Sequence, residues 1–258
     1  SAALDSPTAN EPYLLRHPDS SKVVLRIAQC QKDLPSPNTD SDLVIDASFG
    51  WGDGHHPTTN LCLEFLASHV SQDKNQEILD FGTGSGILGM AACRMGCKHV
   101  LGVDIDDEAI EQAESNLLEN SITSDRMSIH HVREIVQDMD GISLRDFPEQ
   151  GARQFDVVAA NILVGPLMKL APVLALAVKE DTGVLCLSGL REEQVPALAT
   201  EYAKFGVKFT EIRTRTHTNW RVGAEGEGVW AQVSATRRSL SSEERAEIAS
   251  QMSELAVG

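Results

Sequence analysis

The sequence predicts an α/β protein with a doubly wound, Rossmann-like sheet of seven strands and a small N-terminal extension. Three observations lead to this fold class. Short apolar stretches alternate with amphipathic ones along most of the chain, which is the order that a parallel sheet covered by helices requires. The glycine-rich turn GTGSG at residues 82–86 follows one apolar stretch and precedes a helical one. The next apolar stretch ends in an acid, Asp104, as in folds that bind a ligand at the carboxyl edge of the sheet.

The N-terminal region differs in composition from the rest of the chain. Three prolines among polar residues predict an irregular arm over residues 1–22. Strands are expected at 23–28 and 43–46, separated by a polar loop. This unit, residues 1–45, has too little apolar material to fold alone, so we expect it to pack as an extra edge on the main domain.

The main domain is expected over residues 46–238. Its seven strands are predicted at residues 78–79, 99–103, 127–132, 155–160, 183–187, 207–214 and 228–234, the last two as an antiparallel closing pair. Its helices are predicted at residues 60–70, 87–94, 107–120, 166–179 and 192–205. Pro57 suits the first turn of the first of these helices. The uninterrupted apolar run at 155–160 is typical of a strand buried on both faces. Residues 132–154 are expected to form a surface segment with a short helix.

A helical tail is predicted over residues 239–258. Ser241 and Glu244 have the spacing of a capping box, and Ile248, Met252 and Leu255 fall on one face of the helix that follows. This apolar face can pack on the core or bind a partner. Packing on the core is the preferred interpretation.

Charge and cysteine content narrow the classes of function. The formal net charge is −16, from 38 acidic and 22 basic residues, which disfavours direct binding of nucleic acid and suits a basic partner. No stretch approaches the roughly 20 apolar residues that cross a bilayer, so no membrane association is expected. Five cysteines without a Cys-x-x-Cys pair favour a reducing compartment, either the cytoplasm or an organelle with a reducing interior.

The glycine turn and Asp104 together predict a nucleoside site. A dinucleotide fingerprint needs its third glycine at position 87, where this chain has Ile87, so binding of a pyrophosphate is disfavoured. Alternate glycines at 82, 84 and 86 leave the backbone bare for a ligand. Asp104 is placed to accept hydrogen bonds from ribose hydroxyls. A purely structural turn would leave this acid unexplained.

Five segments carry a resemblance to a known family. They read WGDGHHPTTNLCLEFL, LDFGTGSGILGMAA, GVDIDDEAI, FDVVAANIL and LSGL. The chain resembles the bacterial ribosomal-protein methyltransferases of the PrmA type, over about residues 46 to 235. The resemblance implies a seven-strand methyltransferase sheet and the cofactor S-adenosyl-L-methionine, which leaves as S-adenosyl-L-homocysteine. The resemblance also implies an N-terminal recognition domain, which we expect to be missing, shrunken or trimmed off here.

Asn161 is the candidate catalytic residue. Methyl transfer to an amine is a one-step displacement, so the protein mainly aligns the reactants and excludes water. Asn161 ends the fourth strand and offers a side-chain carbonyl that can hold the attacking amine; capping of the strand end is its alternative role. The resemblance assigns cofactor contacts to Thr59, Gly82, Asp104 and Asn161, and the glycine loop adds Gly84.

The motif before the first helix contains further candidate residues. In the family pattern, Trp51 stands for Phe and Asp53 for Thr. Asp53 is a hypothetical receptor for a cationic amine at the rim of the pocket. His56 is expected to fix the loop before the helix rather than act as a base, and His55 occupies a position that the family leaves variable. No metal site is indicated.

The preferred function is that of an S-adenosylmethionine-dependent protein N-methyltransferase. The resemblance implies lysine side chains or an N-terminal amine of a large-subunit ribosomal protein of the L eleven type as the substrate, and such a protein is basic. Methylation of another protein or a small amine is the first alternative. A catalytically idle cofactor-binding module is the second, and the combination of Gly82, Gly84, Asp104 and Asn161 argues against it. The sequence leaves the oligomeric state open, and a monomer is favoured.

Overall fold

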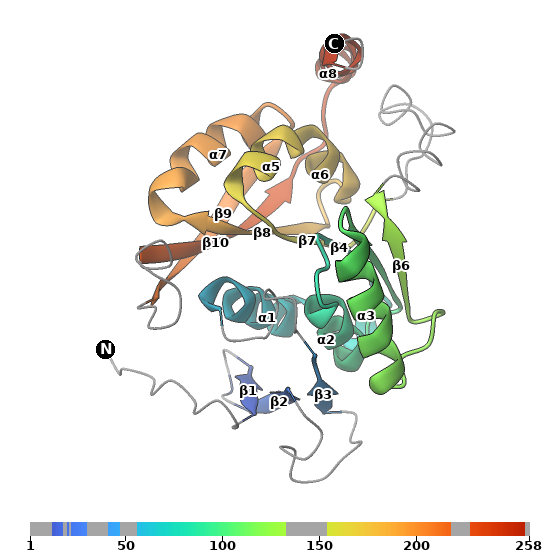
Figure 1. Cartoon of the computed structure of the whole chain (residues 1–258). Coiled ribbons are helices and arrows are strands. Elements are labelled where there is room, and N and C mark those ends of the chain that lie inside the picture. The colour runs from blue at the N-terminus through green and yellow to red at the C-terminus, as the bar shows by residue number, and fades with distance from the viewer. Residues whose placement is uncertain are drawn as a thin grey trace.

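The main domain is built on one seven-stranded sheet, shown in Figure 1. The computed structural model describes residues 12–17, 20, 22–29, 41–46, 56–132, 154–217 and 228–255. The strands are β4 (Glu77–Phe81), β5 (His99–Asp104), β6 (Met127–His131), β7 (Val157–Asn161), β8 (Val184–Arg191), β9 (Val207–His217) and β10 (Gly228–Arg237). They lie in the order β6-β5-β4-β7-β8-β10-β9. The first five are parallel, and β10 is antiparallel to both β8 and β9. The predicted fold class and the antiparallel closing pair are confirmed.

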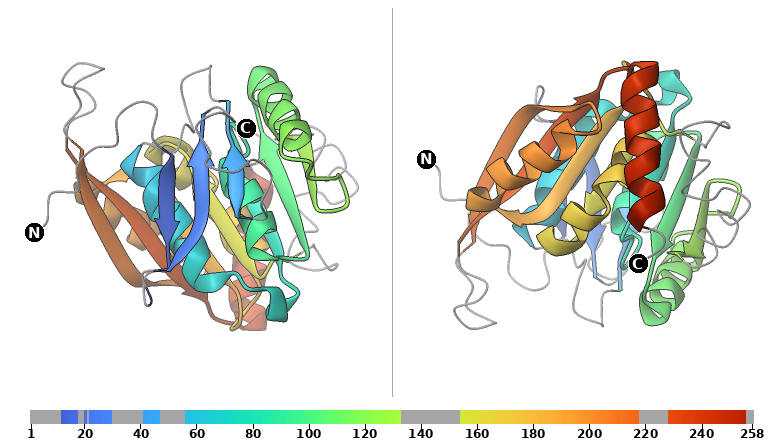
Figure 2. Two further views of the ribbon diagram at one scale, coloured as in Figure 1. Left: turned by 90° about the horizontal axis from the view of Figure 1, so that it is seen from below. Right: turned by 90° about the horizontal axis from the view of Figure 1, so that it is seen from above.

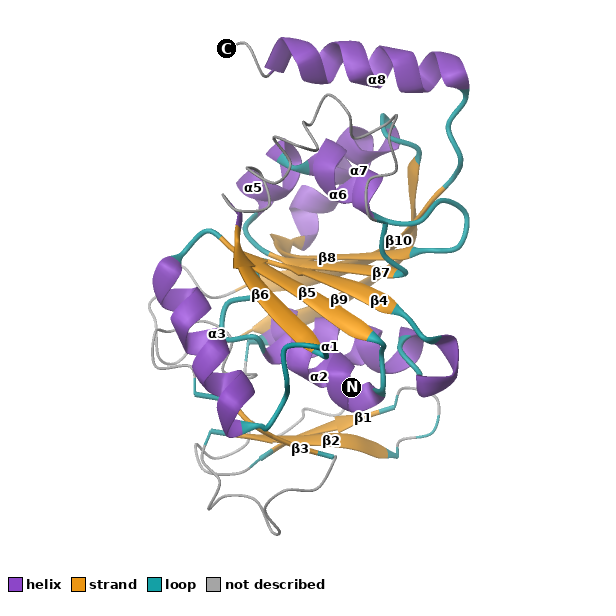
Figure 3. Ribbon diagram, turned by 90° about the vertical axis from the view of Figure 1, so that its right-hand side faces the viewer, coloured by secondary structure: helices purple, strands orange, loops and turns teal. Residues whose placement is uncertain are grey.

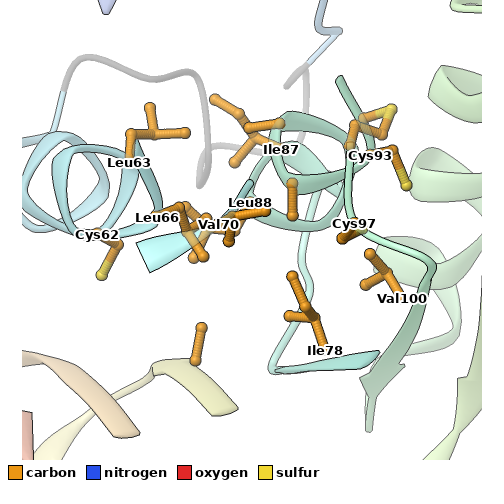
Figure 4. Close-up of a cluster of buried hydrophobic side chains, with 14 of the residues drawn as sticks. Cys62, Leu63, Leu66, Val70, Ile78, Ile87, Leu88, Cys93, Cys97 and Val100 are labelled. Atoms are coloured by element: carbon orange, nitrogen blue, oxygen red, sulfur yellow. The ribbon is translucent and has the colours of Figure 1, made fainter. Parts of the chain in front are cut away.

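Helices cover both faces of this sheet, as Figure 3 shows. One face carries α1 (Pro57–His69), α2 (Ile87–Met95) and α3 (Asp107–Glu119), and the other carries α5 (Val164–Lys169), α6 (Ala171–Ala177) and α7 (Val195–Ala203). Short 3-10 turns precede β4 and α7, at Gln72–Lys74 and Glu192–Gln194. Two buried apolar clusters fill the two interfaces, and part of the first is drawn in Figure 4. None of the helices in these described ranges is long and apolar enough to cross a membrane.

The N-terminal region forms a second, smaller sheet. It contains β1 (Tyr13–Arg16), β2 (Val23–Ala28) and β3 (Asp42–Val44), with β1 antiparallel and β3 parallel to β2. It lies on the outer side of α1 and α2, as Figure 2 shows from below. One prediction was therefore wrong, because Tyr13–Arg16 is a strand and not part of an irregular arm. The small unit packs on the main domain as predicted, but it does so as a separate three-stranded layer over α1 and α2 and not as an extra edge.

The composition of α1 explains this additional layer. The residues buried on α1 surround most of the helix and include Leu61, Cys62, Leu63, Phe65 and Leu66. A helix that is apolar all round must be covered on every side. The main sheet covers one side of α1, and the small sheet covers the outer side with five buried aliphatic residues. These residues are Leu15, Leu25, Ile27, Leu43 and Ile45.

The prediction of a single helix over residues 166–179 was also wrong, because the structure has two helices there. α5 ends at Lys169 and α6 begins at Ala171, with Leu170 between them at φ −90° and ψ 6°. Pro172 lies in the first turn of α6, where its missing N–H costs nothing. In the middle of one long helix, the same proline would remove a hydrogen bond and clash with the preceding turn.

The C-terminal tail forms α8 (Ser242–Leu255), seen from above in Figure 2. The predicted capping box is present, because the Glu244 amide donates to Ser241 Oγ (3.2 Å) and the Ser241 amide donates to Glu244 Oε2 (2.8 Å). Leu240 and Ile248 are buried in the cluster on the α5–α7 side of the main sheet. This burial agrees with packing of the tail on the core. The side chains of Met252 and Leu255 lie outside the described residues.

Candidate functional site

Asp104, Gly82 and Asn161, at the ends of three neighbouring strands, lie in a row at the carboxyl edge of the main sheet. Phe81 pairs with Val103 on one side and with Ala160 on the other, so Gly82 follows β4 beside Asp104 and Asn161. Asn161 in turn pairs with Ser188, which precedes Gly189 in β8. The strand order reverses between β4 and β7. Ligands of open α/β sheets bind at such a switch point, so the topology alone places a site between Gly82 and Asn161.

The glycine loop is a tight turn with a bare backbone. The amides of Gly82 and Thr83 both donate to the carbonyl of Val103, at 2.8 and 3.0 Å. Gly82 and Gly84 have positive φ values of 75° and 53°, which residues with a Cβ rarely adopt. A Cβ on Gly82 would collide with Ile162, whereas a Cβ on Gly84 would meet no atom within 4 Å. Gly82 thus permits close packing of the two strand ends, and Gly84 faces open space where a ligand can approach.

Asp104 holds the loop as well as facing it. Its Oδ2 accepts a hydrogen bond from the Gly84 amide (2.9 Å). Its Oδ1 accepts from the amides of Ile105 (2.7 Å) and Asp106 (3.2 Å). A carboxylate has about four lone-pair sites, so one remains on Oδ2 for a hydroxyl of a ligand. The acid predicted to bind ribose therefore also fixes the conformation of the glycine loop.

Asp80 is a second acid at the loop, and the sequence reasoning gave it no role. Its side chain is buried, and Oδ2 accepts from Thr83 Oγ1 (2.8 Å) and from the Gly89 amide (3.0 Å). Burial raises the pKa of Asp80 to about 6, against the opposing effect of these two hydrogen bonds. Its Oδ1 is buried and accepts no hydrogen bond within the described part of the chain. An acid within an apolar strand just before the glycines was the signal that could have identified it.

Asn161 and Thr59 meet across the site. The Asn161 amide nitrogen donates to Thr59 Oγ1 at 3.4 Å, although 102 residues separate the two in sequence. This bond uses Nδ2, so the carbonyl oxygen Oδ1 of Asn161 is available as an acceptor. Thr59 is buried in the first turn of α1. The structure therefore brings the five predicted site residues to one edge of the sheet, where Gly82 lies between Asp104 and Asn161, Gly84 is bonded to Asp104, and Thr59 is bonded to Asn161.

His56 fixes the start of α1. Its Nδ1 accepts from the Thr58 amide (3.3 Å) and lies 2.6 Å from Thr58 Oγ1, so it acts as the N-cap of the helix. The loop that His56 is expected to fix lies outside the described residues, so that prediction stays open, and what the structure shows is the helix cap. A ring nitrogen engaged in this way is poorly placed to abstract a proton from a substrate.

An aromatic cluster adjoins His56. The ring of His56 lies 4.8 Å from that of Trp230 in an edge-on arrangement and 5.2 Å from that of His217. The guanidinium of Arg191 lies over the face of Trp230, 4.8 Å from the ring centre. These residues come from β8, β9 and β10 at the same edge as Asn161. No local pattern in the sequence indicates this cluster, because its members meet only in the folded chain.

Several predicted features lie outside the described residues. They are Trp51, Asp53, His55 and the segment 133–153. The hypothesis that Asp53 receives a cationic amine therefore stays a prediction.

The sheet and its site define a class of protein. Numbered from β4, the strand order is third, second, first, fourth, fifth, seventh, sixth, with a glycine loop after the first strand and an acid after the second. This is the Rossmann-like fold of the S-adenosylmethionine-dependent methyltransferases. The family model of the ribosomal protein L11 methyltransferases (PrmA) matches residues 18–223, and the chain belongs to this family.

Individual relatives and solved structures are similar to this chain to different degrees. The ribosomal protein L11 methyltransferases of Shewanella denitrificans and Colwellia psychrerythraea are each 39% identical over 189 residues, which are 73% of this chain and 58% of each relative. The chain thus spans less than two thirds of the length of these relatives. The crystal structure of a ribosomal protein L11 methylase from Lactobacillus delbrueckii subsp. bulgaricus has a similar fold, with a TM-score of 0.61 and 24% identity over 88% of this chain and 100% of that one. The structure of M. jannaschii TYW2 in complex with AdoMet has a TM-score of 0.50 and 15% identity over 76% of this chain and 82% of that one.

Proposed function

We propose that this protein is an S-adenosylmethionine-dependent protein N-methyltransferase. The observation that carries the proposal is the row of Asp104, Gly82 and Asn161 at the switch point of the sheet. One end of this row suits a nucleoside and the other suits an amine. Membership of a methyltransferase family supports the same activity.

The residues at the site fit the proposed cofactor. The open space at Gly84 leaves the backbone bare for a ligand, and Asp104 keeps a lone pair for a ribose hydroxyl. Asp80 keeps a buried carboxylate oxygen that accepts no hydrogen bond from the described residues, which suits a cationic group. Ile105 follows Asp104 and is 71% exposed, so it offers an apolar surface for a base. When bound, the cofactor supplies an activated methyl group on a sulfonium.

The chain's own contribution to transfer is alignment. The attacking amine must be neutral with its lone pair directed at the methyl carbon, and a hydrogen-bond acceptor can hold it in that orientation. Asn161 Oδ1 is such an acceptor, since Thr59 engages the amide nitrogen of the same side chain. Gly189 and Gly82 enclose Ile162 between them and so fix the segment that follows Asn161. No covalent nucleophile is needed, and His56 is already committed as a helix cap.

The proposed substrate is a basic protein, with ribosomal protein L11 as the first candidate because the family carries that name. A net charge of −16 favours the approach of a cationic partner. Lysine side chains and an N-terminal amine are both compatible with the alignment role of Asn161. We place the reaction in a reducing compartment, since the four cysteines within the described ranges are free thiols.

The deciding experiment is a calorimetric titration followed by an activity assay. S-adenosylmethionine and S-adenosylhomocysteine are titrated into the protein, with NADH as a control ligand that the missing third glycine should exclude. A labelled-methyl assay on purified ribosomal proteins follows. We expect both sulfur-containing ligands to bind and the label to appear in one basic ribosomal protein. Binding without label in any ribosomal protein would redirect the search to other protein or amine substrates, and absence of binding would refute the proposal.

Asp104→Ala tests the position of the nucleoside. The variant loses an ionised acceptor and the anchor of Gly84, so we expect the affinity for S-adenosylmethionine to fall by about 1.5–3 kcal/mol or to vanish. Asp107→Ala is the matched control, because Asp107 lies three residues further on with an 84% exposed side chain. Unchanged binding in Asp104→Ala would show that the ribose lies elsewhere.

A further inference from the structure

Two asparagines on α3 bind the end of the N-terminal sheet. Asn116 and Asn120 lie one turn apart, and both are buried. Asn120 accepts from the Val44 amide (2.8 Å) and donates to the Val44 carbonyl (2.6 Å). Asn116 accepts from the Asp46 amide (3.0 Å) and donates to the Asp46 carbonyl (2.8 Å). The two side chains thus pair with residues 44–46 as a neighbouring strand would.

Only one of these two asparagines also contacts the glycine loop. Asn116 Nδ2 donates a second hydrogen bond, to the carbonyl of Ser85 at 2.9 Å. Asn120 Nδ2 instead donates to the carbonyl of Asn116 in its own helix, at 2.8 Å. Asn116 and Asn120 therefore make nearly the same contacts to residues 44–46, but only Asn116 also contacts the glycine loop. Comparing the two residues can therefore distinguish an effect on packing from an effect on the position of the loop.

The carbonyl of Ser85 controls the geometry of the loop. It belongs to the peptide that joins Ser85 to Gly86, and Gly86 is the N-cap of α2 with φ 82°. The Gly86 amide donates to the Thr83 carbonyl at 2.8 Å, while the Gly84 amide is held by Asp104. A donor to Ser85 from α3 therefore restrains the loop at a second point, in addition to Asp104. With both anchors in place, the direction of the bare backbone at Gly84 is set before a ligand arrives.

We propose that Asn116 is a positioning residue that links the end of the N-terminal sheet to the glycine loop and holds the loop in its binding conformation. The linkage runs from Asp46, which precedes the motif that begins at Trp51, through the side-chain amide of Asn116 to the carbonyl of Ser85. Asn116 acts through the loop and is not a catalytic residue. The consequence for cofactor affinity rests on the proposed function, whereas the linkage itself does not.

The test compares Asn116→Asp with Asn120→Asp. Each change keeps one acceptor oxygen and replaces an amide donor by a second oxygen, so both variants lose a hydrogen bond to a carbonyl within residues 44–46. Only Asn116→Asp also loses the donor to Ser85. Asn116→Ser is the second variant at this position, for use if the aspartate does not fold, because it removes the donor without adding a charge.

Two readouts are taken on each full-length variant. The first is amide hydrogen exchange of residues 42–46 and 82–88 without ligand, and the second is the calorimetric Kd of S-adenosylmethionine. Both substitutions should speed exchange at 42–46. Asn116→Asp should also speed exchange at 82–88 and raise Kd by about tenfold, which is the effect of losing one buried hydrogen bond, whereas Asn120→Asp should leave Kd within about twofold.

Equal effects of the two substitutions on exchange at 82–88 would overturn the linkage. Normal exchange at 82–88 in Asn116→Asp would do the same. If the unaltered protein bound no S-adenosylmethionine, the proposed function would fail, and the exchange data alone would then decide whether Asn116 restrains the loop.

Discussion

The N-terminal sheet and the C-terminal helix α8 flank the main domain on opposite sides, and they are attached by different forces. The sheet buries five aliphatic side chains against α1 and α2, and neutral asparagines hold its last strand. The C-terminal tail buries Leu240 and Ile248, and it also makes ion pairs. Arg245 pairs with Glu180, and Arg238 pairs with Glu244.

The N-terminal sheet and the C-terminal tail also differ in how near they lie to the candidate site. The N-terminal sheet ends at residues 44–46, which Asn116 connects to the glycine loop. The tail leaves β10 after Arg237, at the opposite end of that strand from Trp230 and the aromatic cluster. Buried apolar contacts and neutral hydrogen bonds respond little to salt and pH, whereas exposed ion pairs respond to both. We therefore expect the flank near the site to be the one that resists changes in solvent.

Leu25→Ala should produce the largest effect, in the N-terminal sheet. Leu25 is 1% exposed within the cluster formed with α1 and α2, so its truncation leaves a cavity. We expect a loss of about 3 kcal/mol in the free energy of unfolding, measured with urea. Leu14→Ala, at a neighbouring position that is 41% exposed, should change stability by less than about 0.5 kcal/mol. Similar values for the two leucines would mean that the sheet is only loosely packed on the helices.

Glu180→Ala should have the next largest effect, at the base of the tail. Glu180 pairs with Arg237, whose side chain is 1% exposed and also donates to the carbonyls of Ala175, Leu176 and Val178. Burial lowers the pKa of Arg237, and the carboxylate of Glu180 opposes this shift. Removing the carboxylate leaves a buried cation short of a partner, so we expect a loss of about 2 kcal/mol by urea unfolding.

The control for Glu180→Ala is Glu201→Ala, in the exposed pair with Lys204. Exposed pairs of this kind contribute little, so its effect should stay below about 1 kcal/mol. The same destabilisation in both variants would show that Glu180 behaves as a surface residue. The claim that ion pairs attach the C-terminal tail would then lose its support.

The parts of this fold that were predicted correctly have local signals. The capping box at Ser241 lies within four residues, and the buried strand β7 is a continuous apolar run. The proximity of the glycine loop and Asp104 could be predicted, because the carboxyl ends of neighbouring parallel strands meet at one edge of the sheet. The split between α5 and α6 also has a local signal in Pro172, which the prediction of one helix over residues 166–179 did not take into account.

The features that were missed depend on contacts between distant parts of the chain. His56 and Trp230 are 174 positions apart, from 230 minus 56, and no local pattern relates them. Asn116 reads as an ordinary polar residue in an amphipathic helix, although it is buried against Asp46 and Ser85. The layer formed by the N-terminal sheet was missed because we followed only one apolar face of α1, whereas apolar residues surround most of that helix.

A matched pair of arginine substitutions should give smaller effects that sharpen the comparison. Arg94 on α2 donates to the carbonyls of Asp42 and Asn120, at the N-terminal flank. Arg245 on α8 donates to the carboxylate of Glu180, at the other flank. Methionine at either position keeps much of the apolar stem and removes the donors. We expect Arg94→Met to cost about 1 kcal/mol of stability at any salt concentration.

Arg245→Met should cost less, and its cost should diminish as salt rises. The pair with Glu180 is partly exposed, so salt at about 1 M, where the Debye length is about 3 Å, should screen it. Urea unfolding of both variants at low and high NaCl gives the measurement. A salt-dependent cost for Arg94→Met, or a constant cost for Arg245→Met, would contradict the contrast between the flanks. In that contrast, Arg94 bonds to uncharged carbonyls and Arg245 forms an ion pair with a carboxylate.

The smallest expected effect is a dependence on pH at the start of α8. The hydrogen bond from Arg238, followed by that from the Ser241 amide, lowers the pKa of Glu244 to about 2. An unfolded glutamate titrates near about 4.3, so the contribution of Glu244 is complete above that pH and is lost as the pH falls toward 2. Glu244→Gln should therefore be less stable than the unaltered protein at pH 6, and the difference should shrink between pH 4 and pH 2. Asp181, whose pKa the Ser239 hydroxyl also lowers, is present in both proteins and cancels in this difference. A difference that persists unchanged to pH 2 would show that Glu244 stabilises the tail through its shape and not through its charge.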